Sequence, residues 1–197
     1  MSATFARPLW RPDISPATVI VNAAPNGFAD SVTLDPATLR AAGALVQGQL
    51  HAVVADASGD HRLWLQNGTG AVQAAVLIPL DDHFDQRVQN AQRLYRRLNG
   101  RPTGPQPLWQ RLSTYQLHRI ALMLRAWDGT ESGASRREVA SVLLNRDVMM
   151  LRAIDWKNAP ERRRLNRLLT TTRELINGGY LRLLRGDPLH VHLFRSR

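Results

Sequence analysis

The chain carries the sequence NAPERRRLNRLLTTTRELIN at residues 158–177. Its apolar side chains recur every three or four residues, which predicts an amphipathic helix with one buried face. Asn158 and Pro160 fit the start of a helix, because an asparagine side chain caps free N–H groups and proline loses no hydrogen bond there. Gly178 and Gly179 are expected to end it. The residues predicted to face inward are Leu165, Leu168, Leu169, Thr172 and Ile176.

The opposite side of this predicted helix is polar and mostly basic. From Lys157 to Arg173 the chain has six basic residues and one acidic residue. Arginine can pair with guanine, asparagine with adenine, and threonine with a base or a phosphate, so the stripe can read a major groove. The stripe consists of Arg163, Asn166, Arg167, Thr170 and Glu174, and the residues expected at phosphates beside the helix start are Lys157, Arg162 and Arg164. The alternative is a solvated helix face that binds nothing.

Two helices are predicted upstream of this one. Ser113 with Gln116, and Ser135 with Glu138, have the three-residue spacing of a capping box. The first helix is expected to bury one side, made of Leu117, Ile120, Ala121, Leu124 and Trp127. In the second helix the inward residues are Val139, Ala140 and Leu143.

The second of these helices begins within GASRREVA, residues 133–140. Small residues at its start let another helix cross closely, as in the first part of a helix-turn-helix motif. Arg136 and Arg137 lie at this start and complete the predicted DNA-binding set.

The N-terminal part has the pattern of β-structure. Apolar runs at residues 18–21, 50–55, 63–65 and 71–80 are separated by turn sequences such as Asn67-Gly68. They predict a small antiparallel meander, with a short helix near residues 35–44. At the other end, residues 180–184 and 190–194 flank a Gly-Asp-Pro turn and could form a C-terminal β-hairpin, which would serve as a wing.

The fold class predicted from these patterns is α+β, a β-rich module followed by a helix-turn-helix domain. The β-rich module is assigned to residues 1–81 and a connecting amphipathic helix to residues 82–99. A linker rich in proline and glycine covers residues 100–112, and the DNA-binding domain covers residues 113–197.

Charge is divided unevenly between the two halves. Residues 1–81 hold four basic and six acidic side chains, whereas residues 82–197 hold 22 basic and 10 acidic ones. Such an asymmetry predicts two parts with different tasks, and it assigns an acidic partner, double-stranded DNA, to the second.

Several classes of protein are excluded or disfavoured. The chain has no cysteine, which removes disulfide scaffolds, thiol catalysis and cysteine-based zinc sites. No nucleophile motif or phosphate-binding glycine loop is present, so we expect no enzyme, no cofactor and no metal. No apolar run approaches the roughly 18 residues that span a bilayer, and no signal core opens the chain, so a cytoplasmic protein without a membrane partner is expected.

Several segments together resemble a bacterial family. They are GASRREVA at 133–140, DWK at 155–157 and GGYLRLL at 178–184, with LWRPD at 9–13 and IPLDD at 78–82 upstream. They are similar to a domain of unknown function, a helix-turn-helix variant found in activators and antiactivators of conjugative and integrative element transfer. Longer members of that family have a further N-terminal helical domain. The resemblance implies transcriptional regulation and a separately encoded partner regulator or partner domain.

The predicted function is therefore a DNA-binding transcription regulator that controls transfer or excision of a mobile element. The alternative is a protein-binding antiactivator or coactivator that sequesters or assists another regulator without reading DNA. The stripe around Arg163 and Arg167 separates the two, because an antiactivator needs no outward, unpaired arginines there. The sequence leaves the oligomeric state open, with a dimer as one possibility.

Overall fold

A computed structural model describes residues 11–186 of the chain. Those residues divide into two compact units, and the boundary along the chain falls between Arg111 and Leu112. The first contains a sheet and one long helix, and the second contains helices only, which confirms the α+β class. Among the described residues, no helix is long and apolar enough to cross a bilayer.

The first unit is built on a six-stranded sheet. Its strands are β1 (Thr18–Ala23), β2 (Thr33–Leu34), β3 (Ala42–Val46), β4 (Gln49–Val54), β5 (His61–Leu65) and β6 (Val72–Leu77). They lie in the order β2-β6-β1-β5-β4-β3. All pairs are antiparallel except β1 with β5, which run parallel. The predicted antiparallel meander is present in β3, β4 and β5, but it does not continue into β6, which pairs with β1 instead of β5.

A turn and a strand occupy the place of the helix expected near residues 35–44. The Asp35 side chain accepts hydrogen bonds from the Ala37 N–H and the Thr38 hydroxyl, which closes a turn. Arg40 then takes a positive φ of 51°, which a helix does not allow, and β3 follows. Asp35 thus opens one turn as a helix N-cap does, since the Leu39 N–H also donates to its carbonyl, and the left-handed conformation of Arg40 ends the chain's helical course there.

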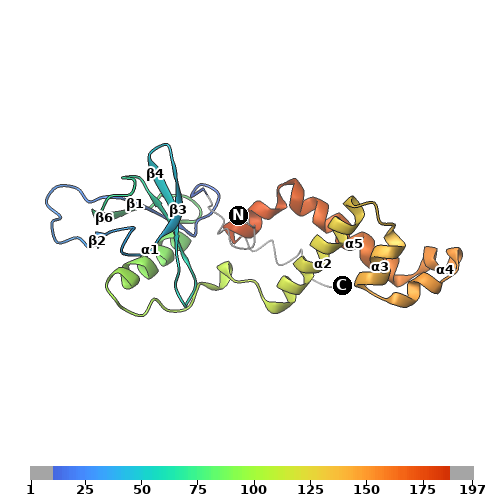
Figure 1. Ribbon diagram of the computed structural model, residues 1–197. Helices are drawn as coiled ribbons and strands as arrows, with labels where there is room; N and C mark the ends of the chain where they lie inside the picture. Colours follow the sequence, from blue (N-terminus) through green and yellow to red (C-terminus); the bar gives the residue numbers. More distant parts are fainter. Residues whose placement is uncertain (1–10, 187–197) are drawn as a thin grey trace. The chain divides into compact units, whose positions relative to one another are not determined.

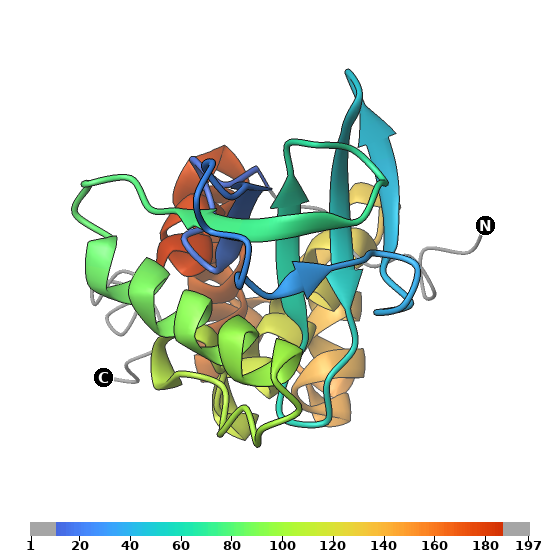
Figure 2. The ribbon, with the colours of Figure 1, turned by 90° about the vertical axis from the view of Figure 1, so that its left-hand side faces the viewer.

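Helix α1 (Phe84–Leu98) packs against one side of this sheet, as Figures 1 and 2 show. Leu94 is buried there among the core side chains of β1 and β5, including Val21 and Leu63. The helix expected to connect the two parts thus lies with the first unit. The following segment also stays with this unit, since the Gln106 N–H donates to the Ser58 carbonyl.

The second unit is a bundle of helices and short turns. Its elements are α2 (Thr114–Glu131), α3 (Arg136–Leu143), η2 (Arg146–Met150), α4 (Ala153–Asn158), α5 (Pro160–Glu174), η3 (Leu175–Gly179) and α6 (Tyr180–Arg185). Both predicted capping boxes are confirmed, with Ser113 and Gln116 opening α2 and Ser135 and Glu138 opening α3. Helix α5 packs against α2, α3 and α4 (Figure 1).

The buried side of α2 differs from the predicted one. Met123 and Ala126 are buried, whereas Leu117 and Leu124 are 55% and 54% exposed. Apolar residues surround α2 on more than one side, so its sequence does not define which side meets α5. The stripe of Leu117, Ala121 and Leu124 is left on the surface of this unit.

Three expectations around α5 are wrong. Its N-cap is Ala159, because Asn158 ends α4 instead of capping α5. A kink at Asn177 and Gly178 follows the helix, and Leu175 is buried while Ile176 is 49% exposed. Residues 180–185 form the helix α6 and not the first strand of a wing. The second strand, predicted at residues 190–194, lies outside the described residues.

Candidate nucleic-acid interface

Helix α5 separates an apolar side from a basic side. Its inner side chains Leu165, Leu168 and Leu169 are buried in two adjoining core clusters. Thr172 is also buried. Its hydroxyl donates a hydrogen bond to the Leu168 carbonyl 2.8 Å away, so the buried hydroxyl group has a partner within the helix. The residues that this packing leaves exposed are Arg163, Arg164, Arg167, Thr170, Arg173 and Glu174.

Three of these exposed side chains form a cationic group on α5. Arg163, Arg164 and Arg167 have no hydrogen-bond or ion-pair partner among the described residues. Like charges four residues apart on a helix destabilise it by about 0.2–0.5 kcal/mol. Guanidinium groups held together in this way provide a binding surface for an anion such as a phosphate.

The predicted stripe is joined to the start of α3. Arg136 Nη1 donates to Asn166 Oδ1 at 3.0 Å, so residues thirty positions apart share one surface. Asn166 is half-buried at the margin of the stripe, while Arg136 is exposed. Because the amide oxygen has two lone pairs, Asn166 can keep this bond while its amide meets an adenine edge.

Arg137 has a different environment from its neighbour. Its Nη2 donates to the Leu151 carbonyl, and its guanidinium carbon lies 5.8 Å from the centre of the Trp156 ring. These contacts fasten α3 to the segment that leads into α4. The side chain is half-buried and engaged in the unit's own packing, unlike Arg136.

Lys157 and Arg162 lie around the start of α5. Lys157 is exposed, and its carbonyl accepts a 3.5 Å hydrogen bond from Arg162 Nη1. No side chain caps α5, and Pro160 occupies its first turn. The first N–H groups of such a helix need other acceptors, and phosphate oxygens are suitable ones.

The segment between α3 and α5 is longer than the turn of a simple helix-turn-helix motif. It contains η2 and α4, and it adds two exposed arginines, Arg146 and Arg152, that were absent from the predicted set. Arg152 donates to Asp155 at 2.9 Å, so its charge is partly balanced. The sequence signal for them is only that they are basic residues between the two predicted helices of the motif.

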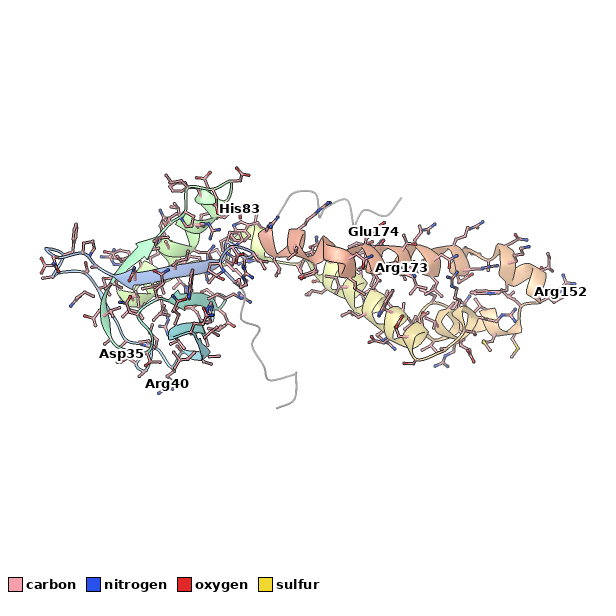
Figure 3. All side chains as sticks on the ribbon, turned by 90° about the horizontal axis from the view of Figure 1, so that it is seen from above. Asp35, Arg40, His83, Arg152, Arg173 and Glu174 are labelled. Atoms are coloured by element: carbon pink, nitrogen blue, oxygen red, sulfur yellow. The ribbon has the colours of Figure 1, made fainter. Side chains whose placement is uncertain are left out.

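Two labelled residues in Figure 3 mark the far end of α5. Arg173 and Glu174 lie at the C-terminal end of this helix, away from Arg152, which precedes α4. The Arg173 guanidinium carbon lies 6.0 Å from the centre of the Trp127 ring on α2. Glu174 ends the polar stripe with a negative charge, so the unbalanced positive charge is concentrated in the first half of α5.

Comparisons with known proteins identify a DNA-binding domain in this part of the chain. A family model described as "T6SS, Transcription factor, DNA binding domain" matches residues 77–185, which include all the elements just described. A second family model, described as a domain of unknown function (DUF7012), matches residues 17–76, the sheet of the first unit. Neither the curated proteins nor the solved structures contain a significant match.

Proposed function

The chain belongs to the family of T6SS transcription-factor DNA-binding domains, and from that premise we propose that it regulates transcription by reading double-stranded DNA with α5. The observation that carries this proposal is the group of Arg163, Arg164 and Arg167, which are exposed, lie opposite the buried Leu165 and have no partner within residues 11–186. The proposed work is binding without catalysis, carried out in the cytoplasm.

In the proposed complex, the outer side of α5 enters the major groove. Arg163 and Arg167 are one turn apart and can each offer two donors to a guanine edge. Asn166 reads an adenine, and Thr170 contacts a base or a phosphate at the next turn. Arg136, Arg164 and Lys157 flank the reading residues and are assigned to phosphates, which fix the position of the helix on the duplex.

Salt dependence tests the phosphate contacts. About five contacts predict that log affinity falls with log salt concentration with a slope of about −4 to −5. Fluorescence anisotropy of a labelled duplex, titrated at several salt concentrations, measures that slope. A slope near zero would contradict DNA as the partner of this surface.

Single substitutions test which residues read sequence. Asn166→Ala is expected to cost about 1–3 kcal/mol on the cognate site and to relax preference at one base pair. Lys157→Ala is expected to weaken binding to all sequences about equally, because phosphates carry no sequence information. Competition between cognate and scrambled duplexes measures both effects. If Asn166→Ala leaves the preference unchanged, the adenine contact assigned to Asn166 is wrong.

The regulated genes form a finer part of the proposal. The resemblance of residues 133–140 and 178–184 to regulators of element transfer supports control of a mobile element, whereas the description of the matched family refers to T6SS. Sequencing of DNA fragments that the protein binds in cells identifies the promoters. Transfer or excision genes among these promoters would support control of a mobile element. Secretion genes among them would contradict it and indicate control of secretion.

One observation favours a second candidate function, contact with a separate transcription regulator. The stripe of Leu117, Ala121 and Leu124 on α2 is apolar and exposed, although such residues usually pack against other groups. Under this second proposal, replacing Leu117 and Leu124 by serine releases a co-purifying regulator while DNA affinity is unchanged. The test is to identify the proteins recovered together with the bound DNA fragments, and to compare the unchanged chain with the serine variant.

A further inference from the structure

A cavity of about 720 Å³ lies in the first unit. Ile20, His51 and Trp64 line it from three neighbouring strands. Successive residues of a strand point to opposite faces, and Val19, Val21 and Leu63 pack in the core beneath α1. Ile20, His51 and Trp64 therefore project from the other face of the sheet, while Arg87 reaches the cavity from the first turns of α1. The volume of the cavity is within the range of small-molecule sites, about 300–1,000 Å³.

One wall of the cavity is aromatic and fixed in place. His51 and Trp64 face each other across β4 and β5, and their rings stack with centroids 5.7 Å apart and an interplanar angle of 15°. The Trp64 Nε1–H donates to Gln49 Oε1 at 2.9 Å, which holds the indole orientation. A half-buried stacked pair of this kind offers a flat surface to another planar ring.

A second wall contains a buried arginine with an unsatisfied donor. Arg87 is only 6% exposed. Its Nε and Nη2 donate to Asp81, and Nη2 also reaches the Pro12 carbonyl at 3.1 Å. Its Nη1, however, has no acceptor among the described residues. A buried donor left in this state costs about 1–3 kcal/mol, which an oxygen acceptor would recover.

The charges around the cavity are already balanced. Asp81 lies 2.7 Å from Arg87 Nη2, and these hydrogen bonds lower the pKa of that carboxyl below its usual value, so Asp81 is ionised at neutral pH. At the rim, Arg11 pairs with Asp13 at 2.6 Å. A ligand therefore needs to bring a hydrogen-bond acceptor, and a second carboxylate beside Asp81 would be repelled.

We propose that this cavity binds a small, uncharged, planar aromatic compound that carries a carbonyl acceptor, with its ring against His51 and Trp64 and its oxygen on Arg87. The site lies outside the DNA-reading helix, so it adds a ligand-binding function to the first unit. Its existence does not depend on how α5 reads DNA.

Nitrogen–proton NMR spectra of the full-length chain test the site with three indole probes. Indole-3-carboxamide has the ring and the neutral carbonyl, 3-methylindole lacks the carbonyl, and indole-3-carboxylate adds a charge. We expect the carboxamide to bind tightest and to shift the Trp64 indole N–H signal. The signals of Trp127 and Trp156, which belong to the other unit, should not move. No shift at Trp64 with any probe, or equal binding of 3-methylindole and the carboxamide, would overturn the proposal.

Variants assign the binding to the two walls. Arg87→Gln is expected to weaken carboxamide binding by about tenfold or more, because it removes a charged donor. Arg62→Gln is the matched control: in the described part of the chain, Arg62 is half-buried on β5 and its Nε also lacks an acceptor, but it does not line the cavity. His51→Leu keeps an apolar wall without the ring, and it tests the aromatic wall even if Arg87→Gln fails to fold. Unchanged affinity in His51→Leu would overturn the aromatic assignment, as would equal losses in Arg87→Gln and Arg62→Gln.

Discussion

Replacing Arg163, Arg164 and Arg167 together by alanine is expected to lower DNA affinity at least about 100-fold, since each lost base or phosphate contact costs about 1 kcal/mol or more. The three guanidinium groups are exposed and have no partner among the described residues, so their removal breaks nothing within the protein. Anisotropy titrations at one fixed salt concentration measure the loss. The circular dichroism spectrum should not change, because outward polar positions contribute little to stability.

The matched control removes the same charge elsewhere. Arg96, Arg101 and Arg111 are also exposed arginines, but they belong to the first unit. Their triple alanine variant is expected to lose only a few-fold in affinity, from weaker long-range attraction. All three control residues lie within the matched residues 77–185, so equal losses in the two triple variants would contradict the assignment of DNA reading to α5 alone.

Features that depend on neighbouring residues could be predicted from the sequence. Both capping boxes join residues three positions apart, and both are present at the starts of α2 and α3. The buried side of α5 was also predictable, because Leu165, Leu168 and Leu169 form one narrow apolar stripe among charged residues. The α+β class follows from such local patterns.

Features that depend on distant pairing could not be predicted in this way. An apolar run such as that of β1 indicates a central strand, but it does not say that β5 lies parallel beside it. Helix α2 has apolar residues on several sides, and only the position of α5 determines that Met123 is buried and Leu124 exposed. The error at residues 180–185 is of the same kind, since alternating apolar residues in a short segment fit a strand or a helix.

The candidate site was predictable as a set of charges but not as a set of contacts. The sequence places Arg136 and Arg137 side by side at the start of a helix, with nothing to distinguish them. In the structure Arg136 reaches Asn166, whereas Arg137 is held by the Leu151 carbonyl. Partners that are fourteen and thirty residues away decide which of the two arginines remains on the surface beside the stripe.

Replacing Leu165 by alanine is expected to destabilise the second unit by about 2–5 kcal/mol, because a fully buried leucine leaves a cavity that its neighbours fill only in part. Leu165 is 0% exposed and packs with Ala126, Val139 and Leu169, which join α2, α3 and α5 in one core. Loss of this contact loosens the packing that presents the basic stripe. Hydrogen exchange of the α2 and α5 amides in increasing denaturant measures the change.

Leu124→Ala is the control for that substitution, since it removes the same atoms from the same unit. Because the Leu124 side chain is 54% exposed, its loss is expected to cost less than about 1 kcal/mol. Amides of the sheet should exchange at unchanged rates in both variants, because that unit has its own core around Val21 and Leu63. Equal destabilisation by the two substitutions would mean that Leu124 is covered in solution, and the exposed stripe on α2 would then be an occupied interface.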